Sequence, residues 1–161
     1  MDIVEGIRYL DCDDLIECNK AALGVTPNER HVVNHEKLSG VQARPSQHRY
    51  YEQCEDIFFL AAVLFIAVNK GHAFENGNKR TGFIASQVFL TLNGYHFSPT
   101  EEDSLIIAEQ VAVGCKEHND PWILSSWFKS FSCLNEDYNS EEDPAVEKII
   151  LSHSVSIKVV E

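Results

Sequence analysis

The chain has 161 residues, 44% of them hydrophobic, which is enough for one domain with a substantial core. It carries 25 acidic and 13 basic side chains, giving a formal net charge of −12. Nucleic acid and anionic membrane surfaces would repel such a chain, so we expect neither as a partner.

The cysteines and the first residues indicate the compartment. The five cysteines are scattered, odd in number and never spaced as CxxC, a pattern typical of a reducing environment. Residues 1–5 lack the cationic and apolar character of a signal sequence. The longest apolar run, residues 57–68, is too short to span a bilayer. We therefore expect a cytoplasmic protein.

The N-terminal part of the chain predicts two helical segments. The first is expected to begin at Asp11, where Asp11 and Asp14 form a variant of the capping box. It is expected to end near Gly24, because glycine is the usual residue after a helix. A second helical segment is predicted at residues 31–37.

The centre of the chain predicts a loop followed by two core helices. Residues 39–48 contain Gly40 and Pro45, so we expect a loop or a short hairpin there. Residues 51–70 are apolar on nearly every side, which predicts a central helix buried on all sides. A second core helix is predicted at residues 78–92, before the pair Asn-Gly.

Two further helices are predicted to complete the body. Thr100 is expected to cap a helix that runs to about residue 118, with Asp103 completing its capping box. Asp120 is expected to cap the next helix, with Pro121 at the first helical position, where its missing N–H costs nothing.

The C-terminal part of the chain changes in character. Residues 1–132 are predicted to form the domain, an all-α helical bundle. Residues 133–144 are rich in acidic side chains, which is typical of a linker. Residues 145–161 form an extension in which residues 155–159 alternate between apolar and polar, predicting a short strand.

The segment between the two core helices carries the candidate chemistry. Lys79 and Arg80 fall in the first turn of the second core helix, where the helix dipole disfavours cations unless an anion is bound. Gly77 and Asn78 supply a permissive backbone that lets N–H groups converge on an anion. We therefore predict a phosphate-binding site at this helix end.

His72 stands a few residues before that site. Its near-neutral pKa suits a general base that activates a hydroxyl for attack on the bound phosphate. Phe74 is expected to point inward and anchor the loop. Glu75 and Asn76 offer oxygen atoms to a magnesium ion that bridges phosphates.

This stretch resembles the signature of the Fic/Doc family. The signature reads histidine, any residue, phenylalanine, any residue, an acidic residue, glycine or alanine, asparagine, glycine or lysine, and arginine. The likeness extends over roughly residues 8–131, and its order and spacing are closest to the Doc branch. The matching positions are His72, Phe74, Gly77, Asn78, Lys79 and Arg80.

The resemblance implies a Fic/Doc-type fold and a role for each matching residue. His72 would be the general base toward a protein hydroxyl. Gly77, Asn78 and Arg80 would bind the phosphates of a nucleotide. Lys79 marks the Doc branch, in which the terminal phosphate faces the histidine, whereas family members that transfer AMP carry glycine there.

The resemblance also implies a substrate and partners. It predicts a toxin that transfers phosphate from ATP, with Mg²⁺, to a Ser or Thr of a translation factor such as elongation factor Tu. A separate antitoxin is expected as partner, because the inhibitory motif of many Fic proteins is not found in this chain. AMP transfer is the alternative reaction. The acidic position of the signature is Asn76 here, which leaves a weakly active or purely nucleotide-binding module as a further alternative.

Two further segments carry weaker signals. By resemblance, residues 39–48 correspond to a flap that holds the target segment, although an ordinary surface loop has the same composition. The flap residues are Gly40, Val41, Gln42, Ala43 and Arg44. His31 and His35 lie four residues apart, but no third ligand accompanies them, so we expect a solvated helix face.

Overall fold

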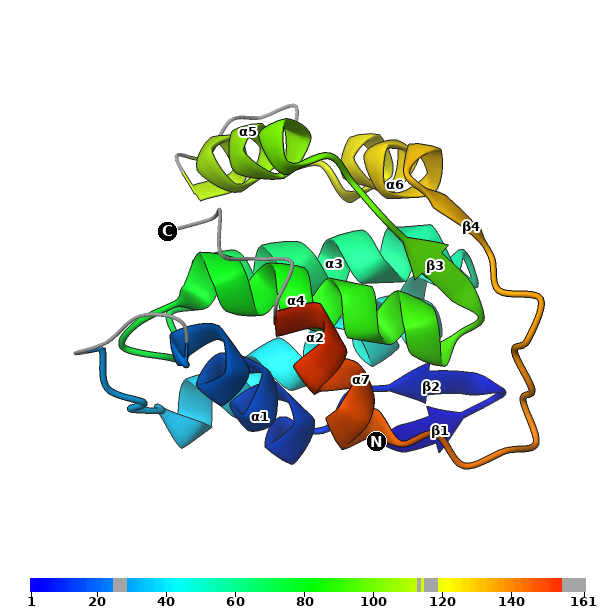
Figure 1. Ribbon diagram of the computed structural model, residues 1–161, viewed down its shortest axis with the longest axis horizontal. Helices are drawn as coiled ribbons and strands as arrows, with labels where there is room; N and C mark the ends of the chain where they lie inside the picture. The colour runs from blue at the N-terminus through cyan, green and yellow to red at the C-terminus, as the bar shows by residue number, and fades with distance from the viewer. Residues whose placement is uncertain (25–28, 113, 115–118, 155–161) are drawn as a thin grey trace.

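The computed structural model describes residues 1–24, 29–112, 114 and 119–154, and within them the protein is an all-α bundle with two small hairpins (Figure 1). This confirms the predicted fold class. The helices are α1 (Cys12–Leu23), α2 (His35–Glu52), α3 (Ile57–Lys70), α4 (Asn78–Leu92), α5 (Glu101–Ala112), α6 (Pro121–Ser130) and α7 (Val146–Ser154). The strands are β1 (Asp2–Val4), β2 (Ile7–Tyr9), β3 (Tyr95–Phe97) and β4 (Ser132–Leu134).

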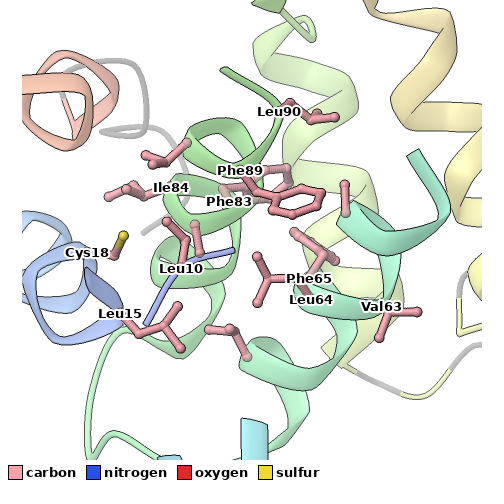
Figure 2. Packing of buried hydrophobic residues seen from close by; sticks show 14 of the residues in the cluster. Leu10, Leu15, Cys18, Val63, Leu64, Phe65, Phe83, Ile84, Phe89 and Leu90 are labelled. Atoms are coloured by element: carbon pink, nitrogen blue, oxygen red, sulfur yellow. The ribbon is translucent and has the colours of Figure 1, made fainter. Parts of the chain in front are cut away.

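Helices α3 and α4 lie side by side at the centre, with α5 and α6 on one side and α1 and α7 on the other (Figure 1). Their facing surfaces are aromatic: the rings of Phe65 and Phe83 meet edge to face with centroids 4.8 Å apart. Figure 2 shows these side chains with Leu64, Ile84 and Phe89 in one continuous core. Burying each such side chain contributes about 1.5–3 kcal/mol, so this pair of helices is the rigid support of the connector between them.

The start of α3 differs from the prediction. The helix begins at Ile57 and not near residue 51, because the side chain of Asp56 accepts hydrogen bonds from the N–H groups of Phe58 and Phe59. Gln53 adopts a left-handed conformation that ends α2. The predicted caps of the neighbouring elements are present: Asp11 and Asp14 form a capping box on α1 and Asp120 caps α6.

The predicted loop or hairpin at residues 39–48 is wrong. These residues lie inside α2, a continuous helix that contains Pro45. Leu38, Val41 and Pro45 are its buried residues. Their spacing of three and four places them on one face, which packs against α3. Burial of this face outweighs the helix-breaking tendencies of Gly40 and Pro45. The preceding segment begins its helix at His35 and not at residue 31, with Asn34 as the cap.

The described residues also contain four short strands, in two pairs, that the sequence did not predict. β1 pairs with β2, and β3 pairs with β4 in antiparallel register. The acidic segment after β4 lies against the body, because the buried Arg8 donates hydrogen bonds of 2.7 Å to the carbonyl oxygens of Ser140 and Glu142. Within the described residues, no helix combines the length and the apolar character needed to cross a bilayer.

After the acidic segment, α7 packs against α1 and α4 and buries Ile150 in the core. The end of the predicted helix at residue 118 and the predicted strand at residues 155–159 both lie outside the described residues. The described part of α5 ends at Ala112.

Candidate functional site

The connector between α3 and α4, residues 71–77, is held by the segment that precedes α2. The N–H of Asn34 donates to the carbonyl of Ala73 at 2.7 Å, and the N–H of Glu75 donates to the carbonyl of Val32 at 3.0 Å. Between them, Phe74 forms an isolated antiparallel bridge with this segment. These backbone bonds give the connector a defined shape although it belongs to no helix.

Asn78 reinforces that shape from the first residue of α4. Its Nδ2 donates to the carbonyl of Phe74 at 2.8 Å, and its Oδ1 accepts from the N–H of Phe74 at 3.3 Å. The Phe74 ring is buried, only 3% exposed. The Asn78 side chain therefore has its amide groups engaged in fixing the loop, and the backbone N–H of this residue is the part left for a ligand.

His72 has an unusual backbone conformation and an exposed side chain. Its φ is +50°, in the left-handed region that costs a residue other than glycine on the order of 1 kcal/mol. Ala73, the next residue, is buried and hydrogen-bonded. The surroundings thus impose the conformation of His72, and its imidazole stands in solvent at the end of α3.

The N-terminus of α4 is not capped by any side chain. The N-cap is Gly77, with φ +77°. The positive φ favours glycine, and a Cβ here would lie 2.9 Å from the Cδ2 atom of Leu23, so any other residue would also have to displace that side chain. The first N–H groups of a helix have no partner inside the helix, and the dipole adds positive potential there. This end of α4 is therefore suited to an anion.

Two cations flank this helix end, and each is already paired with a carboxylate. The partly exposed Lys79 contacts the Oε1 atom of Glu109 in α5 at 2.9 Å. Arg80 is only 6% exposed and donates to the Oε2 atom of Glu29 at 2.5 Å and to the carbonyl of Ala22 at 3.2 Å. A phosphate bound here would share these cations with Glu29 and Glu109 or replace those carboxylates.

The residues expected to hold magnesium do not form a metal site by themselves. Asn76 donates through Nδ2 to the carbonyl of Arg30 at 3.2 Å, and Glu75 is exposed. Among the residues that the structure describes, no three His, Cys, Asp or Glu side chains gather as metal ligands, and His31 and His35 belong to no such group. The side chains present thus do not fit a magnesium ion held by the protein alone.

A buried network behind the connector was missed by the sequence reasoning. Asn19 in α1 is fully buried and donates through Nδ2 to the carbonyl of Asn76 at 2.9 Å and to Oγ1 of Thr81 at 3.0 Å. Its Oδ1 lies 2.6 Å from Nδ1 of His31, which donates because an amide oxygen only accepts. Burial, followed by the charge of Lys20, lowers the pKa of His31. The sequence signal that could have indicated this network is an asparagine on the apolar face of a predicted helix.

Part of the predicted flap lies beside the connector, in helical form. Gly40, Val41 and Arg44 line a cavity of about 480 Å³ that Gly71 also lines. Gln42 points elsewhere, because its Nε2 donates to the carbonyl of Leu10 at 3.2 Å. Ala43 is half-buried in the same helix.

Comparison with known proteins places these features in a family. The family model described as the Fic/DOC family matches residues 9–90, about half of the chain. "Protein kinase doc" of Escherichia phage P1 is 32% identical over 92 residues, which cover 55% of this chain and 70% of that protein. "Toxin Doc" of Mycolicibacterium smegmatis is 32% identical over 88 residues, covering 54% of this chain and 65% of that protein.

The chain belongs to the Fic/Doc family. Both relatives are Doc proteins, so the chain falls in the Doc branch, as its lysine at position 79 predicted. Family membership and the relative named as a kinase support an enzyme of the transferase type. The matched region contains α1 to α3, the whole connector from Gly71 to Gly77, and α4 except for its last two residues.

Proposed function

We propose that this protein is a Doc-like toxin that transfers the terminal phosphate of ATP to a Ser or Thr hydroxyl of a protein, with His72 as general base. The observation that carries the proposal is the exposed imidazole of His72, fixed on a connector that leads into the uncapped, cationic end of α4. A base and an anion site on one rigid loop supply the two requirements of phosphoryl transfer, positioning and charge stabilisation.

In the proposed reaction His72 accepts the proton of the acceptor hydroxyl. The acceptor oxygen then bonds to the terminal phosphorus, and the bond from that phosphorus to the bridging oxygen of ADP breaks. The leaving ADP oxygen takes the electron pair, and the imidazolium returns its proton to solvent. A general base contributes typically 10²–10⁴-fold to such a step.

The end of α4 would bind the phosphates during this step. Backbone N–H groups of its first turn and the side chains of Lys79 and Arg80 would stabilise the negative charge of the phosphoryl oxygens. Magnesium supplied with ATP would neutralise phosphate charge, and Asn76 or Glu75 are the residues that would offer it a protein oxygen. None of the steps assigned to the protein's residues depends on the ion.

The wider biological role is proposed from the relatives. A relative named as a toxin supports the role of a toxin controlled by a cognate antitoxin. We extend to this chain the target implied by the Doc resemblance, a translation factor such as elongation factor Tu, which would place the reaction in the cytoplasm. The matched regions span 70% and 65% of the two relatives, so their activities enter here as a proposal for this chain.

The reaction can be tested with ATP labelled either on the terminal or on the innermost phosphate, supplied with magnesium and a cell extract containing elongation factor Tu. We expect protein label only from the terminal phosphate. Label only from the innermost phosphate would contradict phosphotransfer and establish AMP transfer instead.

The required variant is His72→Asn, because asparagine tolerates a positive φ and removes the base. We expect a loss of at least 100-fold in the labelling rate with unchanged thermal unfolding. His96→Asn, at an exposed position on β3, is the matched control and should keep full activity.

A nucleotide-binding module without catalysis is the second candidate, favoured by Asn76 at the acidic position of the signature and by the carboxylates paired with both cations. It would be established if equilibrium dialysis shows ATP binding while no protein becomes labelled. Asn76→Asp then separates the causes, because restored labelling with magnesium assigns the defect to metal capture.

A further inference from the structure

Beside the connector, one face of α2 and the end of α3 enclose a groove. Lys37, Gly40, Val41 and Arg44 recur at helical spacing and line the cavity of about 480 Å³ that also reaches Lys70. A second cavity of about 250 Å³ shares Arg44 with the first and extends toward α6. The two cavities adjoin each other through shared lining residues and are together called here the α2–α3 groove.

The charge of the α2–α3 groove is opposite to that of the chain. Lys37, Arg44 and Lys70 line it, while no Asp or Glu is among the described residues that line either cavity. In a chain with 25 acidic and 13 basic side chains, three cations without a carboxylate are a local inversion of charge. The groove is therefore the place where a negatively charged ligand would not be repelled.

These three cations also lack the ion pairs that other basic residues make. Lys20, Arg49, Lys79 and Arg80 each contact a carboxylate. By contrast, Lys37, Arg44 and Lys70 form no ion pair with any residue that the structure describes. All three are exposed, so their charges are available to a partner.

The shape and lining of the α2–α3 groove fit a polypeptide segment better than a small anion. Val41, Ile66 and Ala67 give it an apolar floor between the cations. At Gly40 an added Cβ would meet no atom within 4 Å, so the groove is open to solvent along α2. An apolar floor with charged walls matches a peptide that alternates acidic and apolar side chains.

One end of the α2–α3 groove adjoins the proposed base. Gly71 lines it, and the next residue is His72, whose Cα is about 3.8 Å further along the chain. A segment bound in the groove would therefore pass close to the exposed imidazole. This adjacency distinguishes the groove from an unrelated basic surface.

We propose that the α2–α3 groove binds an acidic segment of the acceptor protein and so presents the neighbouring Ser or Thr hydroxyl to His72. The inference rests on the proposed phosphotransfer for the role of the segment, but not for its binding. Lys37, Arg44 and Lys70 would contact carboxylates of the segment, and Val41 and Ile66 would contact its apolar side chains. Acidic residues beside the acceptor hydroxyl are thus the predicted mark of a substrate.

Binding is tested without nucleotide, by fluorescence anisotropy. The probes are short fluorescein-labelled peptides with one central Thr flanked by Glu, Asp and Leu, and matched peptides with Gln and Asn in place of Glu and Asp. We expect the acidic peptides to bind at least about tenfold more tightly and to weaken as salt is raised. Equal affinity for the two peptide sets would overturn the proposal.

Two sets of variants locate the binding. The triple variant Lys37→Gln, Arg44→Gln, Lys70→Gln should lose the preference for the acidic peptides. The triple variant Lys20→Gln, Lys129→Gln, Lys148→Gln has the same change in net charge at other exposed positions and should keep it. Gly40→Phe should block the groove while leaving every charge in place, and Gly40→Ala is its control. Unchanged binding in both groove variants would overturn the assignment.

Labelling experiments then separate this inference from the proposed function. With labelled ATP, the acidic peptides should become phosphorylated and the amide peptides should not. If extract proteins are labelled but bound acidic peptides are not, the groove does not present the acceptor and the inference fails alone. If nothing is labelled and ATP still binds, the proposed function fails, while the anisotropy result still decides whether the groove takes acidic segments.

Discussion

Helices α1 and α4 lie against each other but begin in opposite ways. At the start of α1, Asp11 and Asp14 form a capping box, and the ammonium group of Met1 contacts both carboxylates. At the start of α4 there is a glycine with no side-chain cap, followed by two cations. One helix end satisfies its N–H groups internally, and the other leaves them available.

This difference indicates that the start of α1 contributes to stability and the start of α4 to ligand binding. Carboxylates at the start of α1 complement the helix dipole and stabilise the fold by about 1 kcal/mol for a cap. Cations at the start of α4 oppose the dipole, and here the carboxylates of Glu29 and Glu109 offset that cost in the absence of a ligand. Changes at α1 should therefore alter unfolding, and changes at α4 should alter ligand binding. Asn19, which reaches from α1 to the connector, should alter both.

The largest effect is expected for Asn19→Ala, which removes the link between the two regions. It leaves the carbonyl of Asn76 and the hydroxyl of Thr81 without a buried partner, so we expect a loss of about 1–3 kcal/mol in the free energy of unfolding. Labelling activity should fall as well, because the connector loses its support. Urea denaturation measures the first effect. Thr81→Val removes one bond and should show a smaller loss, and an Asn19→Ala protein as stable as wild type would refute the link.

Lys79→Glu should affect binding at α4 without affecting stability. Its ion pair with Glu109 is exposed, and such pairs are worth about 0–1 kcal/mol, so unfolding should change little. ATP affinity, measured by equilibrium dialysis, should fall on the order of tenfold, because a carboxylate replaces a phosphate-binding cation. Lys129→Glu is the control of equal charge and should bind ATP normally. Normal ATP affinity in Lys79→Glu would remove this residue from the anion site.

Asp11→Ala should give the opposite result at α1. Loss of the cap should cost about 1 kcal/mol of stability while ATP affinity and labelling remain unchanged. Asp13→Ala, in the same first turn but exposed and outside the capping box, should have a smaller effect. A drop in ATP affinity in Asp11→Ala would show that the two helix ends do not act independently.

The smallest effect concerns His31, which joins the Asn19 network. Burial, then the charge of Lys20, lowers its pKa below the ordinary value of 6.5. As the pH falls through about 6.5, the unfolded chain therefore binds a proton at His31 before the folded protein does. The free energy of unfolding is higher above that pH and decreases below it. Thermal unfolding should decline with falling pH in this window, and His31→Asn should flatten the decline. An equal slope in both proteins would exclude His31 as the source.

The sequence predicted the elements whose signals are local. Asp11, Asp120 and the all-round apolar α3 were readable because capping and burial leave marks within a few residues. The residues of the candidate site were proposed from a signal of the same kind, since the signature is a continuous run. Where tertiary contacts decide, the prediction failed: α2 continues through Gly40 and Pro45 because Leu38 and Val41 bury against α3.

Other features need partners distant in the chain. The three-residue strands β1 to β4 are too short for a periodic pattern, and each exists through pairing with another strand. Asn19 contacts Asn76 and Thr81 from 57 and 62 residues away. The ion pair between Arg80 and Glu29 spans 51 residues. The local sequence shows at most that Asn19 lies on an apolar helix face, and it does not indicate which distant residues these side chains contact.

Gly71, at the junction of the groove and the connector, has a consequence for how this site can vary. A methyl group there would lie 2.5 Å from the Cγ2 atom of Val41 and 2.5 Å from the carbonyl oxygen of Ala67. Trimming Val41 to alanine would relieve the first collision but not the second, because the second is with the main chain. No compensating side-chain replacement is therefore open to this position, and any larger residue would force α2 and α3 apart and displace the imidazole. Where the family's chemistry is retained on this scaffold, glycine at this position is expected to be retained with it.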